Sequence, residues 1–185
     1  MTAIVGVVHD GQVHIGGDSA GVSEWSLTVR ADSKVFTNGP YAMGFCGSFR
    51  MGQLLRYTLA TPEPDSDLER FMATTFIDAV RECFKTGGWL KKENEREEGG
   101  LFLVGVQGRL FRIDDDFQVG ESADGFAAVG SGEEFALGAL YATARSRMAP
   151  RKRIKLALEA AERFSTGVRG PFAYITTPVP EERDQ

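Results

Sequence analysis

The chain has 185 residues, of which 42% are hydrophobic and 25% are charged, close to the average of soluble globular domains. This length suits one domain, which we expect to span residues 1–185 with a frayed polar tail at 178–185. The net charge of −5 argues against non-specific nucleic-acid binding, which draws its affinity from cationic side chains. No apolar run approaches the roughly 20 residues of a membrane-spanning helix, so we expect no membrane partner either.

The cysteines and histidines limit the metal chemistry and the compartment. Cys46 and Cys83 are too few for a disulfide framework and have no CxxC spacing. His9 and His14 leave little room for a histidine-based metal site, and the glycine-rich segments match no nucleotide-binding loop, so we expect neither metal nor cofactor. The N-terminus lacks the basic region and cleavage site of a signal peptide. Together these features predict a cytoplasmic protein.

The first third of the chain is predicted to form short strands. Asp10-Gly11 separates two apolar runs, which indicates a hairpin with strands at 3–8 and 13–17. A further short strand pair is expected within 26–36, and another strand at 41–46.

The hydrophobic period then becomes helical. Apolar residues at helical spacing predict a helix over 49–59. Ser66 followed by Glu69 forms a capping-box pattern, which predicts a second helix that ends near Lys85. The charged run 91–98 is flanked by glycines and is interpreted as a solvated loop.

The second half of the chain repeats this order. We expect a hairpin, a strand, two helices and a last strand, at 101–113, 126–129, 135–140, 150–164 and 172–176 respectively. Strands followed by pairs of helices, twice over, predict an α+β fold in which sheets pack on each other and helices cover the outside.

The second residue is the first candidate for chemistry. A threonine hydroxyl is a poor nucleophile unless a base takes its proton, and the free α-amine of an N-terminal threonine is such a base. The pKa of an α-amine, about 7.7–8.0, suits general-base catalysis near neutral pH. Thr2 acquires this amine only if Met1 is removed. The alternative interpretation is that Thr2 is simply a small residue after the initiator methionine and has no chemical role.

Three more polar features stand where apolar strands end. Asp18 follows a glycine pair at the end of a strand, where an acid often points into a pocket or simply forms a turn. Lys34 is a lone cation before an apolar pair, and most such lysines are exposed. Gly47 and Ser48 lie at a strand-to-helix turn, whose N–H groups either stabilise an oxyanion or merely begin a helix.

The order of these motifs resembles the proteasome β-subunit family, and within it the bacterial HslV (ClpQ) peptidase subunits. The matching segments are Thr2–Val7, Gly16–Ser19, Lys34–Val35, Gly44–Ser48 and Val129–Gly132. The resemblance implies an N-terminal-nucleophile hydrolase with a four-layer αββα sandwich.

The resemblance also implies a role for each site residue. Thr2 would supply the nucleophile through its hydroxyl and the base through its amine, with Lys34 close by and Asp18 holding the lysine. The Gly47–Ser48 backbone would stabilise the tetrahedral intermediate. Ser131 would join the network around the amine, although a helix N-cap explains this serine equally well.

Two features depart from the family pattern. Proteasome-type subunits usually carry an acid after the last long helix, whereas residues 161–168 contain no aspartate. Glu162 is left unassigned, and the hydroxyls of Ser165 and Thr166 remain candidates. A retained Met1 is the second departure, because it would turn the Thr2 amine into an amide that is not a base.

The leading functional hypothesis is therefore a threonine-type peptidase subunit of homo-oligomeric stacked rings. Its substrates would be peptides or unfolded proteins, and the resemblance implies an AAA+ unfoldase that delivers them. Two alternatives remain open at this stage: a catalytically inactive ring scaffold of the same fold, and a stand-alone N-terminal-nucleophile amidase.

Overall fold

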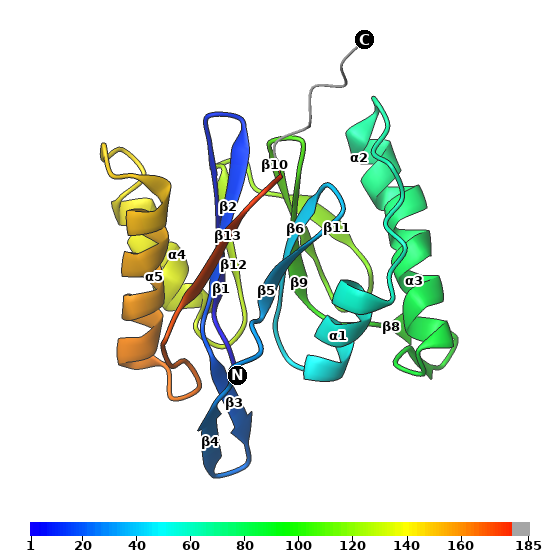
Figure 1. The fold of residues 1–185 in the computed structure, drawn as a ribbon, viewed down its shortest axis with the longest axis horizontal. Coiled ribbons are helices and arrows are strands. Elements are labelled where there is room, and N and C mark those ends of the chain that lie inside the picture. The colour runs from blue at the N-terminus through cyan, green and yellow to red at the C-terminus, as the bar shows by residue number, and fades with distance from the viewer. Residues whose placement is uncertain (179–185) are drawn as a thin grey trace.

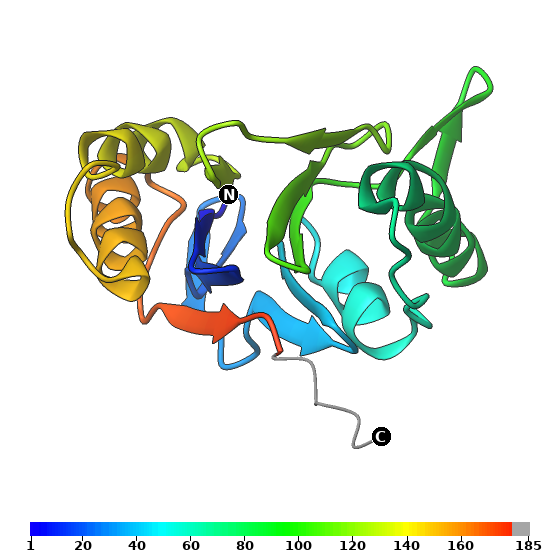
Figure 2. The same cartoon turned by 90° about the horizontal axis from the view of Figure 1, so that it is seen from above.

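Two β-sheets pack face to face in the computed structural model, and helices cover the outer face of each sheet (Figure 1). The model describes residues 1–178, so nearly all of the tail expected at 178–185 lies outside the described residues. From one side to the other the layers are helices, sheet, sheet and helices, as the view from above also shows (Figure 2). The α+β class and the αββα sandwich are thus confirmed.

The first sheet has the strand order β12-β1-β2-β13 and is antiparallel throughout. Its strands are β1 (Ile4–His9), β2 (Gln12–Gly17), β12 (Phe126–Val129) and β13 (Ala173–Thr176). The expected hairpin at its centre is confirmed, because Asp10 and Gly11 both have a positive φ, at 47° and 71°. Two antiparallel helices cover its outer face: α4 (Glu133–Ala142) and α5 (Pro150–Phe164).

The second sheet has the order β11-β10-β9-β6-β5. Its strands are β5 (Val35–Asn38), β6 (Tyr41–Phe45), β9 (Phe102–Val106), β10 (Arg109–Ile113) and β11 (Val119–Glu121). The helical segments on its outer face are α1 (Phe49–Tyr57), α2 (Leu68–Phe71), the π-helical turn η1 (Met72–Phe76) and α3 (Ile77–Thr86). The last three run on without a break, so the expected second helix is confirmed.

The hydrophobic core divides along these layers. One cluster joins each sheet to its helices, and a third fills the space between the sheets with residues such as Ile4, Ile15 and Leu103. The sheets approach closely where β6 has a glycine, because a Cβ at Gly44 would lie 2.5 Å from the Ile4 side chain. The start of β1 in the first sheet thereby packs directly against β6 of the second.

Two regions differ from the sequence-based expectations. The strand pair expected within 26–36 is a hairpin of β3 (Ala20–Ser23) with β4 (Ser26–Val29), which protrudes at the lower end of Figure 1. The charged run 91–98 is also a hairpin, of β7 (Lys91–Glu93) with β8 (Arg96–Glu98), although most of it is exposed as expected. The first difference is one of position, because Ser26–Val29 pairs with the preceding segment Ala20–Ser23. The second arises because the strands within 91–98 are short and charged, and hydrophobic alternation does not reveal such strands.

Neither Ser66 nor Ser131 is the N-cap that the sequence suggested. Asp67, not Ser66, is the N-cap of α2, and its carboxylate accepts a hydrogen bond from the N–H of Arg70. The N-cap of α4 is Gly132, which has no side chain to offer, so Ser131 does not cap the helix. The hydroxyl of Ser131 is used elsewhere.

Candidate active site

Thr2 lies directly before β1, at the end of the sandwich from which the β3–β4 hairpin protrudes (Figure 1). It is 1% exposed. The loop after β12 wraps around its backbone: the N–H of Gly132 donates to the Thr2 carbonyl at 3.1 Å, and a Cβ at Gly130 would lie 2.3 Å from that oxygen. Gly130 also has a φ of 104°, so both space and backbone conformation require glycine there.

Lys34 and Asp18 form a buried chain of hydrogen bonds that ends at the Thr2 hydroxyl. The Lys34 Nζ donates to Thr2 Oγ1 at 2.8 Å and to Asp18 Oδ1 at 2.8 Å. The lysine side chain is 2% exposed and the aspartate side chain is fully buried. Of the two interpretations of each residue, the structure rules out an exposed lysine and an aspartate that only forms a turn, and it brings three of the sequence-predicted site residues together.

The Asp18 carboxylate is held by backbone groups as well as by the lysine. It accepts hydrogen bonds from the N–H groups of Ala3 at 3.1 Å, Ala20 at 2.9 Å and Arg169 at 3.3 Å. A buried carboxylate is tolerated when charge-assisted hydrogen bonds replace its hydration. The local N–H of Ala20 and those of two more distant segments, at Ala3 and Arg169, thus determine the position of Asp18, and Asp18 determines that of Lys34.

Burial lowers the pKa of the Lys34 ammonium, and the nearby Asp18 carboxylate only partly opposes this effect. The group consequently gives up a proton more readily than a surface lysine does. Its charge lies within hydrogen-bond distance of the Thr2 hydroxyl, in a place from which water is largely excluded, so its electrostatic effect on that oxygen is strong.

Ser131 is the hydrogen-bond partner of the Thr2 nitrogen. The N–H of Thr2 donates to Ser131 Oγ at 3.1 Å, and Ser131 Oγ lies 3.4 Å from the hydroxyl of Ser165. Sequence reasoning left Ser165 open as a contributor, and the structure places it beside the network. Within residues 1–178 no carboxylate is hydrogen-bonded to this pair of hydroxyls.

Gly47 and Ser48 lie at the same end, where β6 turns into α1. Gly47 has a φ of 87° and is exposed, and a Cβ there would meet no atom within 4 Å, so backbone conformation alone favours glycine. The Ser48 hydroxyl caps α1 by accepting from the N–H of Arg50 at 3.1 Å. The N–H groups of Gly47 and Ser48 donate to no acceptor within the described part of the chain.

A cavity of about 250 Å³ opens beside Thr2. The β3–β4 hairpin forms one side of it through residues such as Gly21, Val22 and Arg30, and Gly47 and Phe49 form another. Neighbouring Cys46 does not line it: burial raises the pKa of its thiol to about 11, and the thiol donates to the carbonyl of Leu101. The cavity is large enough for one amino-acid side chain.

Met1 partly covers this site. Its carbonyl accepts a hydrogen bond from the Thr2 hydroxyl, and its thioether lies 3.9 Å from the hydroxyl of Thr166. A Cβ at Gly167 would lie 2.0 Å from the Met1 Cβ, so the glycine provides the space that this residue occupies. As long as Met1 is attached, the nitrogen of Thr2 is an amide and has no basic lone pair.

Two further residues, Glu162 and Arg169, take part in hydrogen bonds of the segment between α5 and β13. Glu162 accepts from the N–H of Gly170 at 2.9 Å and so stabilises the loop before β13; it does not reach the hydroxyls near Thr2. The Arg169 N–H that binds Asp18 was missed, because a backbone donor carries no signature in its own residue type. The only sequence feature that could have pointed to this backbone donor was the loop with two glycines after the last helix.

Searches of the described residues for other kinds of site give negative results. No group of three or more histidine, cysteine or acidic side chains in residues 1–178 is arranged to hold a metal ion. No helix in that range combines the length and apolar character needed to cross a membrane.

Comparison with known proteins supports the architecture. No protein-family model and no curated protein matches the chain. Among solved structures, Thiobacillus denitrificans BPH in complex with epoxomicin is 22% identical with a TM-score of 0.78, covering 95% of this chain and 97% of that one. HslV from Trypanosoma brucei is 22% identical with a TM-score of 0.69, covering 95% and 98%.

A Gly-1 mutant of Anbu from Hyphomicrobium sp. strain MC1 is 18% identical with a TM-score of 0.65, covering 94% of this chain and 80% of that one. The three likenesses extend over nearly the whole described chain, and at this level of identity they support the fold. The chain therefore has the fold of the proteasome-type N-terminal-nucleophile hydrolases, the family that its motifs resemble.

Proposed function

We propose that this protein is a threonine-type peptidase that becomes active when Met1 is removed. The observation that carries the proposal is the buried Asp18–Lys34–Thr2 chain of hydrogen bonds beside a side-chain-sized cavity. A buried lysine paired with a buried aspartate costs solvation free energy, and replacing such a pair by apolar residues is often neutral or stabilising. Its location at the hydroxyl of Thr2 favours a chemical role over a purely structural one.

The reaction follows from the atoms at the site. The free α-amine of Thr2 takes the proton of Oγ1, and Oγ1 attacks the carbonyl carbon of the substrate peptide bond. The carbon–oxygen π electrons move to the oxygen, and the resulting oxyanion is held by the N–H groups of Gly47 and Ser48. The intermediate collapses by breaking the C–N bond, and the ammonium gives its proton to the leaving amine.

An ester between the substrate and Thr2 remains. The amine then takes a proton from water as the oxygen of that water attacks the ester carbon. The second tetrahedral intermediate collapses by breaking the bond between the carbon and Oγ1, the ammonium returns its proton to Oγ1, and a carboxylic acid leaves with the Thr2 hydroxyl and free amine restored. Lys34 favours the reactive alkoxide through its charge, and Asp18 holds the lysine in place. Ser131 accepts a hydrogen bond from the nitrogen of Thr2 and orients its lone pair.

The proposal extends to assembly and location. A nucleophile at an open sheet end has little selectivity, so restricted access within stacked rings of identical subunits fits this chemistry, with an AAA+ unfoldase as the partner that delivers unfolded chains. Exposed aromatic residues are available for contacts between subunits, among them Trp25 on the hairpin tip and the neighbouring pair Phe135–Phe164. The two free cysteines agree with a cytoplasmic location.

The decisive experiment compares three proteins with verified N-termini. Mass spectrometry first establishes whether Met1 is absent, and hydrolysis of fluorogenic peptides is then measured for wild type, Thr2→Ala and Thr2→Ser. We expect Thr2→Ala to lose activity by about 10³-fold or more, as for other catalytic nucleophiles, and Thr2→Ser to retain part of it. Equal rates for wild type and Thr2→Ala would contradict the proposal.

The absence of an acid from the hydrogen bonds of Ser131 and Ser165 in the described residues favours a second candidate, an inactive ring scaffold of the same fold. An acylated Thr2 nitrogen makes the mechanism impossible, and the Ser131–Ser165 hydroxyls lack the acid that the family pattern places nearby. Retention of Met1 in the purified protein, together with absent hydrolysis even after its enzymatic removal, would favour the scaffold.

A further inference from the structure

Arg30 lies in the wall of the cavity beside Thr2. It follows β4, and its aliphatic stem passes across Gly21 of β3, where a Cβ would lie 2.8 Å from the Arg30 Cδ. The absence of a side chain at Gly21 therefore provides the space that brings this arginine to the cavity.

The guanidinium of Arg30 is fixed in place. It stacks on the ring of Phe49, with Cζ 3.8 Å from the ring centroid, and its Nε and Nη2 each donate to the Asp32 carboxylate at 2.7 Å. Its Nη1 group makes no hydrogen bond to any residue of 1–178. A stacked and ion-paired arginine with donors to spare is pre-organised for another acceptor, because little side-chain entropy remains to be lost.

The charges around the cavity are asymmetric. Arg30 lines the cavity, whereas Asp32 lines a separate hollow that shares Phe49 with it. The Lys34 Nζ lies 5.9 Å from the centroid of the same Phe49 ring. No acidic side chain of residues 1–178 lines the cavity, so a ligand within it lies closer to cations than to their carboxylate partners.

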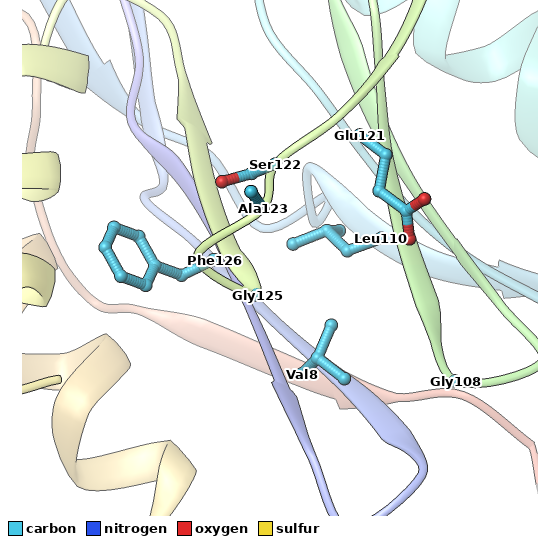
Figure 3. A pocket seen from close by; sticks show the side chains of 8 residues that line it. All are labelled: Val8, Gly108, Leu110, Glu121, Ser122, Ala123, Gly125 and Phe126. Atoms are coloured by element: carbon cyan, nitrogen blue, oxygen red, sulfur yellow. The ribbon is translucent and has the colours of Figure 1, made fainter. Parts of the chain in front are cut away.

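The opposite end of the sandwich has a similar trio of an arginine, an aromatic ring and a carboxylate, but there the carboxylate and not the arginine lines the cavity. Arg109 lies 5.0 Å from the centroid of Phe111 and ion-pairs with Glu121, next to a cavity of about 390 Å³. There the carboxylate lines the cavity and the arginine does not, and Figure 3 shows Glu121 beside the apolar side chain of Leu110. A paired arginine on an aromatic ring is thus not in itself a binding site; what differs at Arg30 is which partner faces the cavity.

We infer that Arg30 makes the cavity beside Thr2 a subsite for a carboxylate side chain of the peptide substrate. The inference rests on the proposed peptidase function. Because Thr2 and Gly47 share the cavity, the side chain that enters it belongs to the residue whose carbonyl Thr2 attacks. The preferred substrate class is therefore peptides with glutamate or aspartate on the N-terminal side of the cleaved bond, and lysine or arginine at that place is disfavoured by like charge.

Binding tests the subsite without requiring cleavage. Labelled peptides that differ only in Glu, Gln or Lys at that residue are titrated against Thr2→Ala protein that lacks Met1, and Kd is measured by fluorescence anisotropy. We expect the Glu peptide to bind about fivefold more tightly than the Gln peptide, as for a partly exposed ion pair, and the Lys peptide to bind most weakly. The Glu-to-Gln ratio falls as salt is added, because the charges are partly exposed.

Three variants in the Thr2→Ala background identify the residue responsible. Arg30→Met keeps much of the stem volume and brings the Glu-to-Gln ratio close to one. Asp32→Asn removes the competing carboxylate and raises the ratio. Arg109→Met is the matched control, because it breaks the equivalent trio at the other end, and it leaves the ratio unchanged.

The outcomes separate this inference from the peptidase proposal. A Glu-to-Gln ratio near one in the Thr2→Ala protein, or a ratio that survives Arg30→Met, overturns the carboxylate subsite even if wild type cleaves peptides. Conversely, a ratio that depends on Arg30 supports the subsite even if wild type cleaves none of the three peptides, in which case the peptidase proposal alone fails.

Discussion

The two ends of the sandwich hold their ion pairs in different ways. At the end with Thr2, Lys34 and Asp18 are almost completely buried and backbone N–H groups share the carboxylate. At the opposite end, Arg109 and Glu121 pair on the surface, where each side chain is about one-third exposed. The buried pair requires backbone donors from several parts of the chain to replace the lost hydration of its carboxylate, whereas the surface pair requires only that two neighbouring strands bring the side chains together.

The largest difference between the ends should appear on removal of the acid. Asp18→Ala leaves the Lys34 ammonium buried without its partner, and we expect a loss of about 3–5 kcal/mol in the free energy of unfolding. Glu121→Ala is the matched change at the exposed pair and should cost about 0–1 kcal/mol. Urea denaturation of both variants measures the two values. Similar losses would contradict the contrast between the ends.

Glycines with positive φ provide the second comparison. Gly47, near Thr2, has open space around its Cβ position, so Gly47→Ala should cost about 1–2 kcal/mol from backbone strain alone. Gly108, in the turn at the other end, has a φ of 74°, and a Cβ there would lie 2.8 Å from the carbonyl oxygen of Gly11. Gly108→Ala should therefore be the more destabilising variant, and thermal unfolding of the pair ranks them. A larger loss for Gly47→Ala would show that the nucleophile end is packed more tightly than its contacts indicate.

The smallest effect on stability is expected for substitution of Ser131. At this residue of the Thr2 end, an effect on catalysis can therefore be separated from an effect on packing. Ser131 caps no helix and is exposed, so solvent can replace its hydroxyl as the partner of the Thr2 nitrogen, and Ser131→Ala should change the free energy of unfolding by less than about 0.5 kcal/mol. Ser48→Ala removes a true N-cap and should cost about 1 kcal/mol.

Peptide hydrolysis is the second measurement on the Ser131 variant. Its rate should fall by up to about tenfold, since a hydrogen bond to the Thr2 nitrogen is worth about 0.5–1.5 kcal/mol. If Ser131→Ala leaves the hydrolysis rate unchanged but lowers the free energy of unfolding, the role of Ser131 is structural.

Local sequence signals predicted most of the fold. The Asp10-Gly11 turn, the helical spacing within 49–59 and Pro150 at the start of the last helix each depend on neighbouring residues, and the structure confirms all three. The hairpin at 20–29 was expected as a strand pair but placed within 26–36. The hairpin at 91–98 was interpreted as a loop, because its strands are short, charged and lack a buried face.

The site was predicted less evenly. Thr2, Asp18 and Lys34 were named from their positions at strand ends and from the family resemblance, and the structure places all three within one chain of hydrogen bonds. Ser131 had two competing interpretations, and the sequence had no means of choosing between them, because a serine before a helix has the same pattern whether or not it caps. Arg30 had no signal at all.

The sequence by itself determined the order of strands and helices and the residue types available for chemistry, since turns, caps and hydrophobic periods act over a few residues. Only the tertiary structure decided that Lys34 is buried, that Arg169 supports Asp18 through its backbone, and that Arg30 rather than Asp32 faces the cavity. Burial and charge balance depend on segments more than a hundred residues apart packing against one another, as Asp18 and Arg169 do at a separation of 151. No local pattern contains that information.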